Sequence, residues 1–296
     1  MELSLLKNKS IYSLIMTCVI IGLGYFGKII KNKISKHYFE NLSNRFNHEI
    51  ITVDPYNECA DYKSIDDINF IDGKWFVTSP ANTHHDILIE LFNKGVKDIW
   101  VEKPICPTLH ETLNIFAKKP DDVFLYCDFT WLQHNSIKTL GKNKDIKHIE
   151  MKWLNDGSMI PNDVNIVSDL AIHPISILTF LLMKSLDAIK TIDIIYATNT
   201  SVLINGISQN NTTFNIEVSN SSLKKYRNIS LYCKDKVYRW SSVNEFFIEN
   251  IGDIEKTDAI EENIKHFFNR NNIGYPLDIA RSLETVNIKF DSICIS

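Results

Sequence analysis

The stretch VIIGLGYFGKII, residues 19–30, decides the fold of this 296-residue chain. Its glycines stand at positions 22, 24 and 27, after a β-rich apolar run and before a segment with helical apolar spacing. In such a strand–turn–helix, Gly22 makes a tight turn, Gly24 lets the backbone approach a pyrophosphate, and Gly27 lets the helix pack close to the strand. The pattern predicts a dinucleotide-binding loop at a helix N-terminus. A plain strand–turn–helix without a ligand is the alternative.

An aspartate ends the next predicted strand, HEIITVD, at position 54. It follows Gly27 by 27 residues (54 − 27), more than the usual ~20, because the intervening helix and loop are long. A carboxylate at this position accepts hydrogen bonds from both ribose hydroxyls and repels a 2′-phosphate. The following residues, PYNE, contain no arginine or lysine that would bind such a phosphate. Asp54 therefore favours NAD over NADP.

Strands and helices alternate through residue 127, which predicts βαβ units and a parallel sheet. The expected strands are 17–21, 48–54, 73–80, 98–104 and 122–129, and the expected helices are 25–42, 83–95 (with Thr83 as N-cap) and 108–119 (with a Thr108–Glu111 capping box). After residue 128 the pattern changes. A helix is expected at 131–141, a long strand at 145–155 and a second helix at 168–184. A strand-rich region at 190–250, with a hairpin at 228–242, precedes two closing helices at 258–270 and 276–291. The chain is thus predicted to be α/β, with a doubly wound domain at 1–127 and an α+β domain at 128–296.

Composition and charge exclude several classes of protein. The hydrophobic fraction of 44% is sufficient for a core, while the net charge of −4 and the absence of a basic block favour neither nucleic acid nor a membrane as partner. Six scattered cysteines show no disulfide or metal-binding spacing, so we expect reduced thiols, a cytoplasmic protein and no metal site. Residues 1–15 are an uncertain extension, either an extra helix or a segment upstream of a start at Met16.

Two further segments, VTSPANTHHD and WVEKPICP, end the third and fourth predicted strands. Ligands of a doubly wound sheet gather at such carboxyl ends. Asn82 and His84 are expected to reach the nicotinamide ribose, whereas His85 is expected to be an exposed helix start. Lys103 is expected to donate a hydrogen bond to a substrate oxygen and to stabilise a developing alkoxide. An ordinary surface lysine is the alternative.

Taken together, GLGYFG, VDP, TSPANTHHD, VEKP and NDVNIVSDLAIHPISIL resemble the glucose-fructose oxidoreductase / inositol dehydrogenase (Gfo/Idh/MocA) family in order and spacing. The resemblance spans roughly residues 16–296. It implies an N-terminal Rossmann domain and a C-terminal domain with an open, mostly antiparallel sheet. It also implies a nicotinamide-dependent oxidoreductase that acts on a sugar, nucleotide sugar or cyclitol and forms a homodimer or homotetramer.

The resemblance assigns the catalytic roles to Lys103, Asp169 and His173, and it implies a cis Lys103–Pro104 bond. Asp169 and His173 are four residues apart, so a helical turn would place them on one face. We expect Asp169 to orient His173, which takes the proton of a substrate hydroxyl while hydride leaves the same carbon. An N-cap aspartate and a packed core histidine are the alternative. The predicted cofactor-binding residues are Gly22, Gly24, Tyr25, Phe26, Gly27, Asp54, Ser79, Pro80, Asn82, His84, Glu102 and Lys103.

Two departures from the family leave the substrate open, because the loop LNDGSMIPNDVN carries no arginine and the chain is short. The predicted pocket-lining residues are Trp131, His134, Asn135 and Trp153. Two other functions stay open beside a dehydrogenase: a sugar lyase or hydrolase that uses the cofactor transiently, and a non-catalytic NAD(P)-binding regulator.

Overall fold

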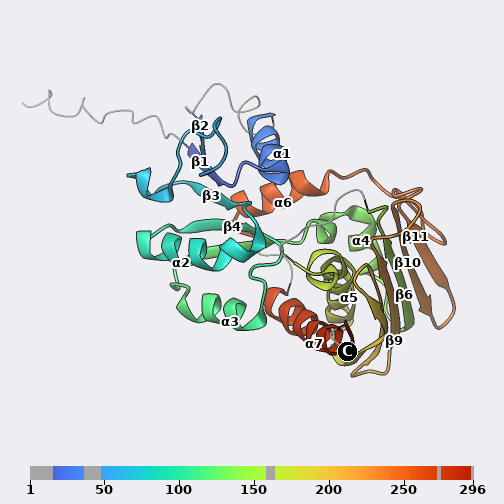
Figure 1. Cartoon of the computed structure of the whole chain (residues 1–296). Helices are drawn as coiled ribbons and strands as arrows, with labels where there is room; N and C mark the ends of the chain where they lie inside the picture. The colour runs from blue at the N-terminus through green and yellow to red at the C-terminus, as the bar shows by residue number, and fades with distance from the viewer. Residues whose placement is uncertain (1–15, 37–47, 158–163, 272–274, 295–296) are drawn as a thin grey trace, which may run out of the picture.

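The computed structural model describes residues 16–36, 48–157, 164–271 and 275–294, which form two sheets with their covering helices (Figure 1). Residues 1–15, and with them the predicted extension, lie outside the described residues, as does the end of the predicted helix 25–42. The N-terminal sheet is parallel and has the strand order β2-β1-β3-β4-β5. Its strands are β1 (Met16–Ile21), β2 (His48–Val53), β3 (Lys74–Val77), β4 (Asp98–Glu102) and β5 (Phe124–Asp128).

Both faces of this sheet are covered, which explains why its strands are almost continuously apolar. Alternate side chains such as Val77 and Ile99 point to a core formed with α2 (His84–Lys94) and α3 (Leu109–Lys118). The other set, which includes Phe76, Trp100 and Tyr126, packs against α1 (Tyr25–Ile34) and α6 (Ala259–Phe268). Helix α6 therefore covers the N-terminal sheet although it lies beyond the predicted domain boundary at 127/128.

The C-terminal sheet has eight strands in the order β13-β12-β11-β10-β6-β9-β8-β7, and among its described pairs only β6 and β9 run parallel. This agrees with the predicted open, mostly antiparallel sheet. Its strands are β6 (Ile146–Leu154), β7 (Ile189–Thr198), β8 (Ser201–Ser208), β9 (Thr213–Ser219), β10 (Tyr226–Cys233), β11 (Val237–Ser241), β12 (Phe247–Ile248) and β13 (Gly252–Asp253). Helices α4 (Asn135–Leu140), α5 (Ile172–Lys184) and α7 (Pro276–Cys294) lie on one side of it (Figure 1).

Local signals set several element ends as predicted. Thr108 and Glu111 form the capping box of α3, and Gly95 ends α2 with a φ of +84°. Thr83 precedes α2, but its hydroxyl bonds to Ser79 and to the Pro80 carbonyl and caps no helix N–H, because the 3₁₀ turn η3 (Ala81–Thr83) already places it in helical geometry.

Two predicted helices are interrupted. The segment expected as one helix at 131–141 is the 3₁₀ turn η4 (Thr130–Gln133) followed by α4, because His134 between them has extended backbone angles. The helix expected at 168–184 starts with the π-helical turn η5 (Val167–Ala171) before α5. Residues Val167–Lys184 are long and apolar enough to cross a membrane, but 78% of the stretch is buried inside the protein, as in a core helix.

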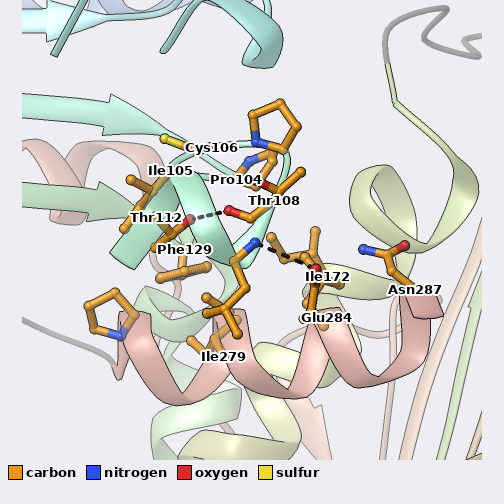
Figure 2. Close-up of a pocket in the computed structure, with 15 residues that line it drawn as sticks. Pro104, Ile105, Cys106, Thr108, Thr112, Phe129, Ile172, Ile279, Glu284 and Asn287 are labelled. Atoms are coloured by element: carbon orange, nitrogen blue, oxygen red, sulfur yellow. Dashed lines mark hydrogen bonds between the residues drawn. The ribbon is translucent and has the colours of Figure 1, made fainter. Parts of the chain in front are cut away.

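A small cavity lies where the loop after β4 and the start of α3 meet α7 (Figure 2). There Glu284 of α7 accepts a hydrogen bond from the Leu109 N–H. The volume of this cavity, about 20 Å³, is enough for roughly one water molecule. The cavity is therefore a packing gap between the two halves of the chain and is too small for a substrate.

Candidate active site

The glycine loop has the shape that a pyrophosphate requires. Gly22 has a φ of +92°, and a Cβ on it would lie 2.6 Å from the Ser79 nitrogen. A Cβ on Gly27 would lie 2.0 Å from the Gly22 oxygen, so helix and turn are in close contact. A Cβ on Gly24, by contrast, would meet no atom within 4 Å. Gly24 is the N-cap of α1, and no side chain caps that helix end, so its N–H groups remain open to an anion.

Asp54 follows β2 and lies beside this loop. Its carboxylate accepts hydrogen bonds from the backbone N–H groups of Leu23 (2.8 Å), Tyr56 (2.9 Å) and Asn57 (3.0 Å). Partial burial opposes ionisation of Asp54, but these donors outweigh it and the pKa of the carboxyl lies below its usual value. Asp54 is thus a fixed anion at the edge of the glycine loop. The open space at Gly24 and this carboxylate together fit the phosphates and a ribose of a dinucleotide.

The two predicted residues that open α1 have different surroundings. Tyr25 is exposed, so it is free to approach a ligand at the helix end. Phe26 stacks on Trp100 with ring centroids 6.0 Å apart and belongs to the core between α1 and the sheet. Its predicted role as a cofactor contact is therefore less direct than that of the glycines.

The strand ends of β3 and β4 are joined by His84. This residue is 1% exposed, and its Nδ1 and Nε2 each lie 2.9 Å from a carbonyl oxygen, of Pro104 and Ser79 respectively. The placement differs from the predicted contact with a ribose, because both ring nitrogens already face protein oxygens. Pro80 begins the η3 turn, and Asn82 lies exposed on it, at the position predicted for cofactor contact. His85 lies at the helix start and contacts Asp86 and Asn114.

Lys103 and Asp169 come together across the two halves of the chain. The Lys103 Nζ donates hydrogen bonds to the Asp169 carbonyl oxygen at 2.9 Å and to its Oδ1 at 3.2 Å. Both side chains are less than one-fifth exposed. The Lys103–Pro104 peptide bond is cis, which confirms that prediction. The predicted alternative of an ordinary surface lysine is wrong, because this ammonium is partly buried and forms an ion pair with Asp169, 66 positions further along the chain.

His173 lies one helical turn beyond Asp169, but the predicted pairing of the two is not what the structure shows. Asp169 bonds to Lys103, and no hydrogen bond of the His173 ring occurs within the described residues. The physical reason is the π-helical turn, which changes the register between the two residues. The ring instead packs 6.2 Å from Trp153. Burial, with the charges of Lys103 and Arg227, lowers the pKa of His173 well below its usual value.

Arg227 of β10 is a site residue that the sequence did not single out. Its guanidinium lies 5.1 Å from the Trp153 ring, and its Nη2 donates to the Asn155 side chain at 2.6 Å. Burial lowers the pKa of Arg227 to about 10, so it remains a cation at neutral pH. It lies beside the loop after β6, which carries no arginine of its own. Only strand pairing between β6 and β10 brings it here, and no local pattern announces that pairing.

Three of the four predicted pocket-lining residues, Trp131, His134 and Trp153, form part of an aromatic wall. Trp131 contacts Trp153 edge-on at 4.9 Å, and His134 stacks on Phe246. Beyond Trp131 lies a cavity of about 510 Å³, lined by Thr130, Trp131, His134, Lys256, Thr257, Asp258, Ala259 and Ile260. The wall therefore lines this space through Trp131 and His134 and contacts His173 through Trp153.

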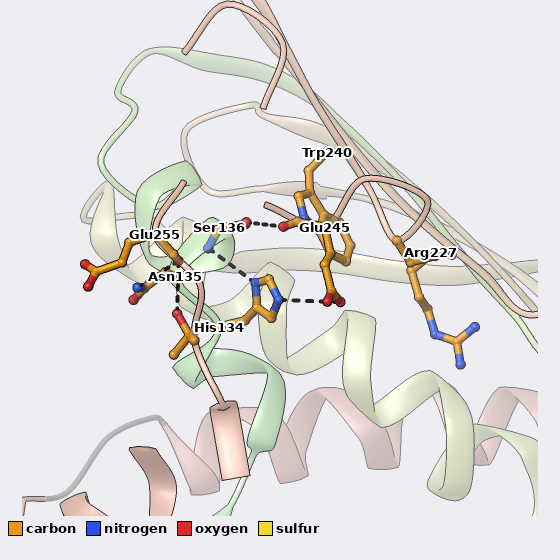
Figure 3. A network of polar contacts seen from close by, with 9 residues as sticks. His134, Asn135, Ser136, Arg227, Trp240, Glu245 and Glu255 are labelled. Carbon is orange, nitrogen blue, oxygen red and sulfur yellow. Dashed lines mark hydrogen bonds and ion pairs between the residues drawn. The ribbon is translucent and has the colours of Figure 1, made fainter. Parts of the chain in front are cut away.

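His134 and Asn135 themselves are anchors of the surrounding loops (Figure 3). The His134 Nδ1 accepts the Ser136 N–H, and its Nε2 faces Glu245 at 4.0 Å. Asn135 donates to the Glu255 carbonyl. Figure 3 shows Arg227 on the far side of Trp240 from this network. Trp153 is fully buried, so it belongs to the aromatic wall and has no surface exposed to a ligand.

The described geometry brings together a glycine loop, a ribose-type carboxylate, a lysine paired with an aspartate, and a histidine with a lowered pKa. Residues 16–119 match the family model described as "Oxidoreductase family, NAD-binding Rossmann fold", GFO_IDH_MocA. This segment is a Gfo/Idh/MocA-type NAD-binding domain. The predicted family resemblance and the predicted NAD-binding fold are confirmed. No group of His, Cys, Asp or Glu among the described residues has the arrangement of a metal site.

The whole chain is similar in fold to several solved dehydrogenases. It is similar to UDP-N-acetylglucosamine 3-dehydrogenase GnnA from Acidithiobacillus ferrooxidans, with a TM-score of 0.79 and 16% identity over 94% of this chain and 99% of that one. It is also similar to a myo-inositol dehydrogenase from Corynebacterium glutamicum, with a TM-score of 0.72 and 15% identity over 94% and 96%. The scyllo-inositol dehydrogenase of Lactobacillus casei, solved with NAD(H) and scyllo-inositol, gives 0.68 and 14% over 94% and 98%. No curated protein matches the sequence.

Proposed function

We propose that this protein is an NAD-dependent dehydrogenase that transfers hydride between the cofactor and a hydroxyl or keto carbon of a sugar, nucleotide sugar or cyclitol. The observation that carries the proposal is the Lys103–Asp169 pair at the carboxyl end of β4, in an NAD-binding sheet and close to His173. The solved proteins of similar fold act on substrates of these classes.

The residues divide the work as follows. Asp169 fixes the Lys103 ammonium, because its carbonyl oxygen and its Oδ1 each accept one of the ammonium N–H groups. The third N–H is left for a substrate oxygen. A cation at that position stabilises an alkoxide as the hydroxyl loses its proton. His173 is neutral at physiological pH and can accept that proton. NAD, when bound, accepts or returns the hydride. Gly22, Gly24, Gly27 and Asp54 would hold it, and the absence of a cation directly after Asp54 supports NAD over NADP.

The test is spectrophotometric turnover with NAD⁺ and a panel of sugars, nucleotide sugars and cyclitols. Lys103→Ala should lower kcat/KM by about 100-fold or more, because one stabilising cation is lost from the transition state, while NADH binding is retained. Lys97→Ala, which removes a half-exposed lysine paired with Asp122, is the matched control. Unchanged turnover in Lys103→Ala would contradict the proposal. Product formation without net NADH would instead support a lyase or hydrolase, and cofactor binding without any turnover would support a regulator.

We also propose a cytoplasmic homodimer or homotetramer, assembled through the uncovered face of the eight-stranded sheet. The described cysteines are free thiols, in keeping with a reducing compartment. The uncovered face carries charged pairs such as Lys152–Glu217, and the edge strand β7 exposes Ile195 and Tyr196. Light scattering coupled to size exclusion tests the assembly, and a monomer would contradict it.

A further inference from the structure

Two carboxyl groups stand side by side at the carboxyl edge of the NAD-binding sheet. Glu102 ends β4, Asp128 ends β5, and the two are partners in the parallel register. Neighbouring strands lie about 4.8 Å apart, and partners in register point to the same face. That face is the one on which Trp100 and Tyr126, two residues earlier in each strand, pack against α1 and α6.

Asp128 is completely buried and only half satisfied. Its Oδ1 accepts hydrogen bonds from the Thr130 hydroxyl at 2.8 Å and from the Asn263 amide at 2.5 Å. Its Oδ2 is buried and has no hydrogen-bond partner within the described part of the chain. A buried, ionised oxygen without a partner is strongly unfavourable, whereas a protonated one can donate to a neighbouring carboxylate.

The surrounding charges favour a retained proton. Lys103 is the nearby cation, but its ammonium is already bonded to Asp169, so three carboxyl groups face one positive charge. Burial, against the opposing charge of Lys103, raises the pKa of Glu102 to about 8 and that of Asp128 to about 7.

Three other titratable groups around the pair are uncharged. Burial raises the pKa values of Tyr126 and Cys127 on β5 and of Cys106 after β4, so these groups stay protonated. From α6 the facing group is the neutral amide of Asn263, and the α2 residue His84 contacts the carbonyl of Pro104. The pair therefore titrates as a unit, with Lys103 and Asp169 as its charged neighbours.

The fold also determines which end of NAD meets this pair. Asp54 on β2 is the ribose-type carboxylate, and the pyrophosphate site is the glycine loop after β1. Because the strand order is β2-β1-β3-β4-β5, the other half of the dinucleotide has to extend towards β3 and β4. The end that reaches β4 carries the nicotinamide, which is a cation in NAD⁺ and neutral in NADH.

We propose that Glu102 and Asp128 share one proton in the free protein and release it when NAD⁺ binds, so that this pair makes the site select the oxidised cofactor as the pH rises. The inference rests on the proposed function only through NAD binding. The cationic nicotinamide stabilises the fully ionised pair and so displaces its proton, whereas neutral NADH has no such effect. By linkage, affinity for NAD⁺ then increases with pH until the free pair is itself ionised, and affinity for NADH stays constant.

The test is calorimetric titration of the full chain with NAD⁺ and with NADH between pH 6 and 9, in buffers of different ionisation enthalpy. At pH 7–8, where the pair holds one proton, the wild type should release up to about one proton per NAD⁺ and close to none per NADH. Its NAD⁺ affinity should rise by up to about tenfold per pH unit in that range. Asp128→Asn and Glu102→Gln should each diminish the release and flatten the NAD⁺ profile. The double variant should abolish the release, because burial keeps the pKa of the remaining carboxyl raised in either single variant. Asp122→Asn, which removes an exposed carboxylate at the other end of β5, should behave like the wild type.

NAD⁺ binding to the wild type without proton release would overturn the inference even if neither variant folds, and so would equal release for NAD⁺ and NADH. Undiminished release in both variants would overturn it as well. These outcomes are separate from the proposed reaction, since proton release needs no substrate. A protein that releases the proton but oxidises nothing would retain this inference and lose the proposed function.

Discussion

Gly24→Ala and Gly27→Ala should have opposite effects, although the two glycines belong to one motif. A Cβ on Gly24 meets no atom within 4 Å, and the residue has a φ of −74°, which alanine adopts readily. We therefore expect the free energy of unfolding of Gly24→Ala to change by no more than about 0.5 kcal/mol. The new methyl group would, however, fill the space into which a pyrophosphate has to approach. NADH affinity should fall by about tenfold or more, equivalent to about 1.4 kcal/mol.

Gly27→Ala meets protein instead of open space. Its Cβ would lie 2.0 Å from the Gly22 oxygen and 2.8 Å from the Thr78 hydroxyl, which itself bonds to the Gly22 carbonyl. Helix α1 has to move away from the turn, so we expect a destabilisation of about 1–3 kcal/mol, the usual range for overpacking.

Urea unfolding of the cofactor-free protein, followed by tryptophan fluorescence, and NADH titration separate the two effects. Gly95→Ala is the control, because Gly95 also has a positive φ but lies at the end of α2, away from the glycine loop. It should lose stability and keep NADH affinity. Wild-type NADH affinity in Gly24→Ala would refute the role of Gly24 in pyrophosphate approach. Wild-type stability in Gly27→Ala would refute the close packing of α1 on the turn.

Three other predictions concern the site. Asp54→Ala should weaken NADH binding by about tenfold or more, since a charge-assisted hydrogen bond contributes about 1.5–3 kcal/mol, and a fluorescence titration that shows no loss would contradict the ribose role. Because the pKa of His173 is lowered, kcat/KM for oxidation should stay level as pH falls through 6.5 and decline only at lower pH; a decline centred at 6.5 or above in the pH profile would count against His173 as the base. Trp153→Ala removes a fully buried indole that contacts Trp131, His173 and Arg227. Urea unfolding should show that the free energy of unfolding falls by about 3–5 kcal/mol. A loss below about 1 kcal/mol would show that the aromatic wall is not tightly packed.

Most elements of the fold were predictable because the signals that set them are local. The parallel strands follow from short apolar runs, the α3 start from a capping box, and the β10–β11 hairpin from alternating residues around a polar turn. The glycine loop was predictable for the same reason, because its geometry depends on three positions within six residues.

The parts that were not predictable depend on non-local contacts. The π-helical turn at Asp169 changes its partner from His173 to Lys103, and no sequence pattern distinguishes such a turn from a regular helix. Arg227 and Asp128 reach the site through sheet register, and His84 turns its ring towards two carbonyl groups. Each placement depends on residues tens of positions away, which a single sequence does not pair.

The position of α6 has a consequence for how the chain is made. The aromatic face formed by Phe76, Trp100 and Tyr126 emerges early from the ribosome, but α6 (Ala259–Phe268), which covers part of it, is translated only after the entire second sheet. During that interval the nascent sheet presents an uncovered apolar surface of the kind that chaperones bind and that promotes aggregation. A nonsense mutation before residue 259 would therefore leave a product that retains every residue of the glycine loop but cannot complete the core beneath it.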